Sequence, residues 1–482
     1  MKINQIFNGK LSVGLTASIV YALAMLLSKG LTIITTPIFT RIMPPDQIGI
    51  VNLYTSWYSM IGGIATLALT SGGFQLSLKE FKDERNEYVS SVLTLTSITT
   101  IILGIVYFAN PSFWNKITGL PTALMVLLLV HMFFYPAQEF WLMRQRYEYK
   151  YKSAGLFTFL SVFIATIFSI GAVVLASSTG IKELGTVRLF ANYAVILLFS
   201  SVIWVWILRK GKTFYSDKYW RFSLALSLPM IGNSVAAQIL NVSDRTMISK
   251  MVGNREVGIY STLYTVSSLS LIVWSAINAS FVPFLYENLS KPKKIPKIRS
   301  LSSTILLAFA IVAFLATMMA PEIVKVLATD EYYDAIYIMP PIAAGVFLTS
   351  VSNMYSNLLI YHKKTQFLMV SSIIAAVINV VLNYIGIQKF GYIAAAYTTM
   401  IAYIVLSILQ AIVATKAHYA TVGHGQPFVY NSKFIFVLAC VTVSCCMACL
   451  LFYHTPLLRY IILIIMLVVF WLKRKIIIRL FK

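Results

Sequence analysis

Long apolar runs alternate with short polar connections along the whole chain. A helix needs about 20 predominantly apolar residues to cross the hydrocarbon core of a bilayer. The longest polar connection, Lys416 to Lys433, is far shorter than the roughly 50 residues that a folded domain needs. We therefore expect an all-α polytopic membrane protein without a water-soluble domain. The pattern predicts fourteen membrane-spanning helices, at residues 11–40, 49–72, 88–110, 119–140, 153–177, 186–208, 222–248, 257–285, 301–326, 335–361, 367–388, 390–415, 434–453 and 457–472.

Lys and Arg residues gather in alternate connections, and the connections between these contain few of them. Loops that are rich in Lys and Arg stay in the cytoplasm, so both termini are expected to be cytoplasmic. One missed or invented helix would disturb the alternation in all later loops. The basic segments are residues 79–85, 144–152, 209–221, 291–299, 363–364 and 473–482.

The composition supports a membrane protein and excludes several other classes. Of the 482 residues, 59% are hydrophobic and only 11% are charged. The formal net charge of +23 is spread over short loops that face anionic lipid, with no basic domain, so nucleic-acid binding is not expected. The first apolar run exceeds the roughly 7–15 residues of a signal peptide core, so it is expected to remain as a helix.

The four cysteines lie together inside one apolar span, where they are expected to pack between helices. Their spacing is not that of a zinc site, and no metal or other cofactor is predicted. These residues are Cys440, Cys445, Cys446 and Cys449.

Two segments of the chain are weakly similar to each other. Thr40–Trp57 follows the first predicted span, and Ser249–Val266 follows the seventh. Six spans separate the copies, so they have the same orientation in the membrane, which is typical of transporters with two similar lobes. The matched pairs are Arg41 with Lys250, Gly49 with Gly258, and Ile50 with Ile259.

The repeat predicts two pseudo-symmetric lobes of six helices, followed by two further C-terminal helices. The expected limits are residues 1–208 for the N-lobe, 209–221 for a cytoplasmic inter-lobe loop, 222–415 for the C-lobe, 434–472 for the last two helices and 473–482 for a basic cytoplasmic tail.

Polar residues share one face of the span at 222–248. Gln238, Asn241 and Arg245 are spaced at helical intervals, and Asp244 lies on the adjacent flank. A charge near the middle of a bilayer costs about 2.5–3.5 kcal/mol on insertion scales. Arg245 therefore either lines a wet cavity, reaches the outer interface, or is paired with Asp244 or another group.

Other spans carry further polar candidates. Lys29 is a lone cation in the first span, and Arg41 follows at its outer end. Tyr264 and Asn278 lie in the span at 257–285, and His131 lies in the span at 119–140. The amide and hydroxyl side chains could instead join neighbouring helices by hydrogen bonds, and His131 could be a satisfied bundle histidine or a proton carrier.

A cavity lined by hydroxyls, amides, aromatic rings and a few cations suits a sugar chain joined to a phosphate. Hydroxyl and amide groups exchange hydrogen bonds with sugars, and Lys or Arg attracts phosphate. The pattern favours a polar anionic cargo over a hydrophobic drug.

In length, span count and repeat, the chain resembles the Wzx-type polysaccharide flippases of the multidrug/oligosaccharidyl-lipid/polysaccharide (MOP) exporter superfamily. The most specific segments are Pro37–Tyr54 and Ser243–Ser261. The stretch Gly73–Val89, which is expected to form an amphipathic helix along the membrane surface, is also similar.

The resemblance implies that the chain moves an undecaprenyl-diphosphate-linked oligosaccharide from the cytoplasmic to the outer leaflet of the bacterial inner membrane. It also implies alternating access of two lobes around a cationic cavity, with Lys29, Arg41, Asp244 and Arg245 as functional residues. Coupling to H⁺ or Na⁺ stays open, as does cooperation with a polysaccharide polymerase or chain-length regulator. The polysaccharide could be O-antigen, capsule or exopolysaccharide.

Three alternatives remain. A MATE-like drug or metabolite exporter and a flippase for peptidoglycan lipid precursors have nearly the same physical requirements. A membrane enzyme that uses lipid-linked sugars is disfavoured, because the outer loops are short and the sequence lacks the GxSxG, HExxH and phosphate-loop motifs. We therefore expect a transporter and not an enzyme.

Overall fold

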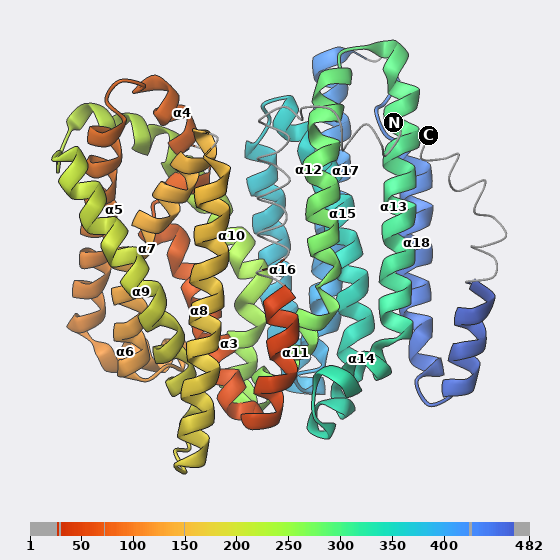
Figure 1. The fold of residues 1–482 in the computed structure, drawn as a ribbon. Helices are drawn as coiled ribbons and strands as arrows, with labels where there is room; N and C mark the ends of the chain where they lie inside the picture. Colours follow the sequence, from red (N-terminus) through yellow and green to blue (C-terminus); the bar gives the residue numbers. More distant parts are fainter. Residues whose placement is uncertain (1–26, 28–29, 72, 149, 424–426, 467–482) are drawn as a thin grey trace. The chain divides into compact units, whose positions relative to one another are not determined.

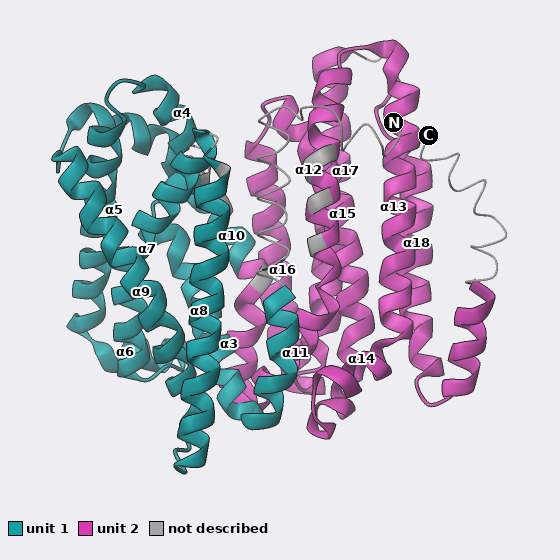
Figure 2. Cartoon of the chain, in the orientation of Figure 1, with its two compact units in different colours: residues 1–238 teal, residues 239–482 magenta. Residues whose placement is uncertain are grey.

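The computed structural model describes residues 27, 30–71, 73–148, 150–423 and 427–466 (Figure 1). These residues form helices joined by short turns, with no strand among them. The chain divides into two compact units, Met1–Gln238 (unit 1) and Ile239–Lys482 (unit 2), which Figure 2 shows in different colours. The division falls inside the long helix α10, whereas the predicted lobe limits lie at the preceding loop; those limits stay a prediction.

After the helical residues 30–42, the described part of unit 1 has five long helices and two short ones before the first part of α10. Their bounds are α3 Pro45–Ala65, α4 Gly73–Glu80, α5 Arg85–Ala109, α6 Pro111–Thr118, α7 Thr122–Tyr147, α8 Tyr151–Ser178, α9 Leu184–Gly211 and α10 Asp217–Met251.

Unit 2 contains the end of α10 and the helices that follow it. Their bounds are α11 Asn254–Ser267, α12 Ser270–Asn288, α13 Ile295–Met318, α14 Ala320–Leu327, the 3₁₀ segment η3 Asp330–Ile338, α15 Met339–Tyr361, α16 Gln366–Phe390, α17 Ala394–Val422 and α18 Ser432–Ala448. A shorter apolar helix covers Pro456–Met466.

Nine helices in the described part of the chain are long and apolar enough to cross a membrane. They match nine of the predicted spans and confirm an all-α polytopic membrane protein. The predicted span at 11–40 lies largely outside the described residues, although residues 30–42 are helical. The exact count of fourteen stays a prediction.

The predicted span at 257–285 is wrong as a single helix, because the chain breaks between α11 and α12. Hydroxyl groups cluster at this point: Thr265, Ser267 and Ser268 each donate a side-chain hydrogen bond to a backbone carbonyl three or four residues earlier. Such bonds compete with the helical ladder and often bend or end a helix.

The two units repeat one packing pattern. In unit 1, α9 packs against α7 and α8, and α5 packs against α7. In unit 2, α17 packs in the same way against α15 and α16, and α13 packs against α15. The matched segments also begin at equivalent positions, since Pro44 directly precedes α3 and Gly253 directly precedes α11.

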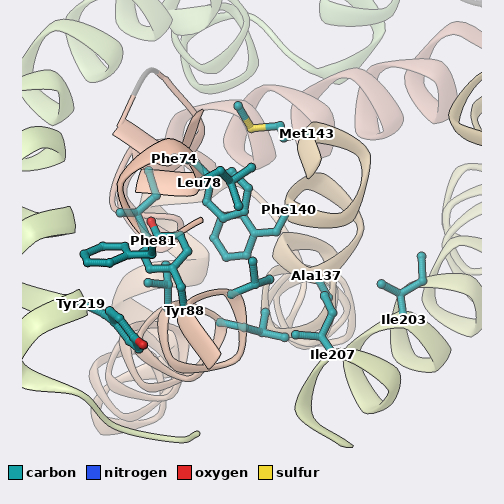
Figure 3. Packing of buried hydrophobic residues seen from close by; sticks show 14 residues of the cluster. Phe74, Leu78, Phe81, Tyr88, Ala137, Phe140, Met143, Ile203, Ile207 and Tyr219 are labelled. Atoms are coloured by element: carbon teal, nitrogen blue, oxygen red, sulfur yellow. The ribbon is translucent and has the colours of Figure 1, made fainter. Parts of the chain in front are cut away.

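An aromatic core anchors the short helix α4 in unit 1 (Figure 3). The rings of Phe74 on α4 and Phe140 on α7 are stacked with centroids 4.7 Å apart, and Leu78 is fully buried beside them. Leu76, on the opposite face of α4, is 48% exposed. The predicted amphipathic helix is thus present, but it ends at Glu80 and not at residue 89.

The beginning of α10 is attached to unit 1 near the same aromatic core. Glu84, in the turn between α4 and α5, accepts hydrogen bonds from the Tyr219 hydroxyl at 2.7 Å and the Lys218 ammonium at 3.0 Å. The Trp220 indole donates to the Ser91 carbonyl at 3.1 Å. These bonds attach the segment that leads from α9 into α10 to the rest of unit 1.

Candidate functional site

Asp244 is a buried carboxylate on α10, within unit 2, and only 2% of it is exposed. One of its oxygens accepts a hydrogen bond from the Tyr260 hydroxyl at 2.5 Å. The other accepts from the Arg245 backbone N–H at 2.8 Å and from the Arg245 guanidinium at 3.4 Å. Because an isolated charge is very costly to bury, these donors and the adjacent cation are what allow Asp244 to lie here.

Arg245 is held on both sides. Its guanidinium carbon lies 4.6 Å from the centroid of the Tyr264 ring, a cation–π distance. Tyr403 on α17 lies close enough to interact electrostatically with both Tyr264 and Arg245. With its side chain 11% exposed, Arg245 is paired with Asp244 and does not extend to an interface. The structure shows the pairing with Asp244, and the function of Arg245 stays a prediction.

The local sequence explains why these groups meet. Tyr260 and Tyr264 are four residues apart on α11, so both rings lie on one face of that helix, with centroids 6.0 Å apart. A tight turn at Gly253, where φ is +153°, returns the chain from α10 into α11. That conformation favours glycine.

A network of neutral side chains lies beside the charged pair. Ser243 donates to the Asn379 side-chain carbonyl at 3.2 Å, and the Asn383 amide donates to the same oxygen at 3.2 Å. Asn379 donates to Thr399 at 3.2 Å, and Thr398 donates to Asn383. These groups satisfy one another, so they join α10, α16 and α17 as interhelical hydrogen bonds.

A second polar cluster lies in unit 1 around His131 on α7. The imidazole is 2% exposed and stacks on the Tyr58 ring with centroids 4.7 Å apart. The rings of Tyr193 and Tyr135 lie 4.5 Å and 4.9 Å away. Neither imidazole nitrogen has a hydrogen-bond partner among the described residues. The role of His131 stays a prediction.

The other predicted site residues are dispersed. Arg41 is exposed and donates to the Pro37 carbonyl at 2.9 Å. The Asn278 side-chain oxygen accepts from Asn357 at 3.0 Å. Gln238 is partly buried on α10 at the end of unit 1. Lys29 and the side chain of Asn241 lie outside the described part of the structure.

The structure thus brings together Asp244, Arg245 and Tyr264, and it places His131 in a separate cluster. Sequence reasoning missed Tyr403, Tyr58 and Tyr193, which complete the two clusters. Tyr58 carried a usable signal, because it lies four residues after Tyr54 on the returning helix of the repeat. Among the described residues, no group of three or more His, Cys, Asp or Glu side chains could hold a metal ion.

An apolar groove of about 740 Å³ lies within unit 2 between α15, α17 and α18. Its wall is mostly aliphatic, with Leu348 and Ile404 among its lining residues. Its polar lining includes Lys416, Thr415 and Ser432, all near the ends of α17 and α18 that are predicted to be cytoplasmic. The groove could accept a long hydrocarbon chain with a polar group at one end.

Comparison with known proteins gives two family matches and one curated relative. Residues 15–289 match the family described as polysaccharide biosynthesis protein, and residues 229–385 match the MatE family. The relative is the "Probable low-salt glycan biosynthesis flippase Agl15" of Haloferax volcanii. It is 23% identical over 421 residues, which cover 84% of this chain and 86% of the relative.

Solved structures share the fold. The lipid II flippase MurJ in an inward closed conformation has a TM-score of 0.66 at 13% identity and covers 96% of this chain and 100% of its own. An outward-facing MATE multidrug transporter of the MOP superfamily has a TM-score of 0.56 at 14% identity and covers 87% and 98%.

These findings confirm the resemblance to polysaccharide flippases of the MOP superfamily. They also confirm the expectation of a transporter that is not an enzyme, because the relatives are named as flippases and transporters. The polysaccharide biosynthesis match covers more than half of the sequence. The chain therefore belongs to the polysaccharide biosynthesis protein family and has the fold of MOP-superfamily transporters.

Proposed function

We propose that the chain is a flippase that moves a lipid-linked oligosaccharide from the cytoplasmic to the outer leaflet of its membrane. The observation that carries the proposal is the match to a glycan biosynthesis flippase over 84% of this chain and 86% of that relative. The undecaprenyl-diphosphate carrier, a bacterial inner membrane, alternating access and cytoplasmic termini are parts of the proposal that rest on the sequence resemblance.

Two physical features support this cargo. The apolar groove of unit 2 suits a prenyl chain, because burial of hydrocarbon is favourable in proportion to its area. Lys416, at the polar end of the groove, would attract a phosphate. No bond is made or broken in such a transport step, so no catalytic residue is required.

Lys29, Arg41 and Arg245 are proposed to attract the diphosphate headgroup. Neutralising Lys29 or Arg245 should impair export while the protein still inserts into the membrane. Wild-type export in both Lys29→Ala and Arg245→Ala would remove these two residues from the mechanism.

Deletion of the gene in its host tests the proposal. Lipid-linked oligosaccharide should accumulate in the inner leaflet, the surface glycan should disappear, and a plasmid copy should restore both. A wild-type distribution of the lipid-linked oligosaccharide after deletion would refute the proposed function.

A MATE-like exporter is a second candidate, which the match to the MatE family over residues 229–385 favours. It predicts that the deletion strain becomes sensitive to drugs while lipid-linked sugar stays at its normal level. The same strain therefore decides between the two.

A further inference from the structure

A small pocket lies between the ends of α5, α7 and α9 that are predicted to be cytoplasmic. It belongs to unit 1, and the proposed function assigns no role to it. Polar and aromatic side chains from all three helices line it. Its lining residues include Asn86, Val89, Trp141, Arg144, Trp206 and Lys210.

Close packing of α5 and α9 fixes the position of the pocket. Gly211, the last residue of α9, lies so near α5 that a Cβ atom on it would be 2.2 Å from the Asn86 carbonyl oxygen. Only glycine allows this approach. Val89 and Ile207, which also line the pocket, belong to the buried core of unit 1. The polar lining residues are therefore carried by helix ends that are firmly packed.

Arg144 is oriented by two acceptors and keeps a further donor group. Its Nε donates to Glu148 at 2.8 Å, and its Nη1 donates to the Asn86 side-chain oxygen at 2.8 Å. Its Nη2 has no hydrogen-bond partner among the residues that the structure describes. A guanidinium has five N–H donors in a fixed planar geometry. Arg144 can therefore donate to another oxygen without changing its orientation.

Positive charge exceeds negative charge around the pocket. Glu148 accepts from Arg144 and also contacts Lys150 at 2.6 Å and Arg85 at 3.7 Å, so three cations share this carboxylate. Lys210 adds another cation, which has no ion-pair partner in the described part of the chain. An excess of one sign of charge in a cleft with apolar walls attracts ions of the opposite sign. The pocket therefore favours an anion.

Two tryptophans place the pocket at the level of the lipid headgroups. Trp206 is 41% exposed, and the Lys210 ammonium lies 4.7 Å from the centroid of its ring. Trp141 packs against Phe157 on α8, with ring centroids 5.0 Å apart. Tryptophan is enriched where membrane helices reach the interface, and basic pockets between helices on the cytoplasmic side bind anionic headgroups. The anion that fits here is therefore part of a lipid.

We propose that this pocket binds the phosphate of an anionic phospholipid from the cytoplasmic leaflet. The pocket has a volume of about 10 Å³, which is close to the least that holds one water-sized atom. One phosphate oxygen enters and accepts from Arg144, and a second oxygen accepts from Lys210. The glycerol and the acyl chains stay in the membrane. The bound lipid thereby links the ends of α7 and α9.

Native mass spectrometry of the purified full-length protein tests the site, because it counts the lipids that stay bound. The protein is titrated with phosphatidylglycerol and, separately, with phosphatidylcholine, which carries the same phosphate but no net charge. Wild type should bind its first phosphatidylglycerol at a lower concentration than its first phosphatidylcholine. Equal affinity for the two lipids would overturn the proposed recognition of an anionic headgroup.

Lys210→Gln should weaken the binding of the first phosphatidylglycerol by about tenfold, because a hydrogen bond to a charged group contributes about that factor. Lys210 is exposed, so the variant should fold. Lys364→Gln is the matched control: it removes the same charge from an exposed position that is also predicted to be cytoplasmic, but in unit 2. It should keep the wild-type affinity. Equal affinities of the two variants would overturn the assignment of the site to this pocket.

Thermal unfolding distinguishes a lipid phosphate from free phosphate. Phosphatidylglycerol should raise the melting temperature of the wild-type protein in detergent, and it should raise that of Lys210→Gln less, because a ligand stabilises the folded state that binds it. Inorganic phosphate at the same ionic strength should leave the melting temperature unchanged. If inorganic phosphate stabilises the protein as much as the lipid does, the site binds free phosphate and the proposal is refuted. Neither measurement involves transport, so the outcome does not depend on the proposed flippase function.

Discussion

Individual charges in this protein are stabilised by close and specific partners. The Asp244–Arg245 pair is buried, and its energy depends on Tyr260 and Tyr264 as much as on the pair itself. A buried pair contributes little net stability against an apolar replacement, but removal of one member exposes the cost of burying the other. A single substitution of Asp244 or of Arg245 should therefore lower the stability of the folded protein.

Asp244→Asn should lower the free energy of unfolding by about 3–5 kcal/mol, because the Arg245 guanidinium would then face a neutral amide. Thermal unfolding of the purified protein in detergent measures the change. Asp217→Asn is the control: it removes an exposed ion pair with Arg221 and should cost no more than about 1 kcal/mol. Equal melting shifts for the two variants would contradict the assigned burial of Asp244.

Tyr260→Phe tests the hydroxyl that completes the site. The ring is kept, but one Asp244 oxygen loses the hydroxyl that donates to it at 2.5 Å. The free energy of unfolding should therefore fall by about 1–3 kcal/mol. Tyr384→Phe removes a hydroxyl from a tyrosine that is 56% exposed and should leave the melting temperature unchanged. An unchanged melting temperature in Tyr260→Phe would show that the Tyr260 hydroxyl does not stabilise the Asp244 carboxylate.

The sequence identified Asp244 and Arg245 because adjacent charges inside an apolar span are conspicuous. It could not identify Tyr403, since that residue lies far along the chain and only the packing of α17 brings it to Tyr264. His131 was visible as a histidine in a span. The Tyr58 and Tyr193 rings around it come from other helices, so no local sequence pattern predicts them.

At the scale of elements, the length of the hydrophobic runs predicted the positions of the apolar helices well and those of the more polar helices less well. Helices α3, α10 and α11 carry polar residues that face other helices, so length and hydropathy alone do not define their ends. The break between α11 and α12 depends on hydroxyl groups that compete for backbone carbonyls, and an apolar pattern continues through it.

Glu84 connects two elements through a pH-sensitive contact. Hydrogen bonds from Tyr219 and Lys218, together with the Lys218 charge, lower the pKa of Glu84 from its ordinary 4.5. A lowered pKa means that the stabilisation is present above the unfolded-state value and is lost as the pH falls through the folded-state value. The contact should therefore weaken below about pH 4.5.

Glu84→Gln should consequently lower the melting temperature at pH 7, and its difference from wild type should shrink as the pH falls from about 5 to 3. Glu80→Gln, an exposed change on α4, provides the baseline. A difference that stays constant over this range would mean that the charge of Glu84 does not hold the start of α10.

At the scale of the whole molecule, the internal repeat appears in both units as the same order and packing of helices. The short sequence match between Thr40–Trp57 and Ser249–Val266 indicated this duplication. The compact units nevertheless meet inside α10, because helix packing and not loop composition determines which residues contact each other.

The charge alternation predicts the orientation of every loop and can be tested in intact cells. In a variant without the four native cysteines, Lys182→Cys should react with a membrane-impermeant maleimide, and Lys364→Cys should react only after the membrane is opened. Both positions are exposed, so access depends on the side of the membrane. The reverse pattern would invert the predicted topology.

The most direct test of the account is translocation of lipid-linked oligosaccharide by the purified protein in liposomes. The account predicts that the glycan reaches the opposite leaflet in wild-type liposomes and stays in place in protein-free liposomes. Arg41→Ala, a change at an exposed position, should move the glycan more slowly than wild type although the protein reconstitutes normally. Equal rates with and without the wild-type protein would contradict the claim that this chain is a flippase.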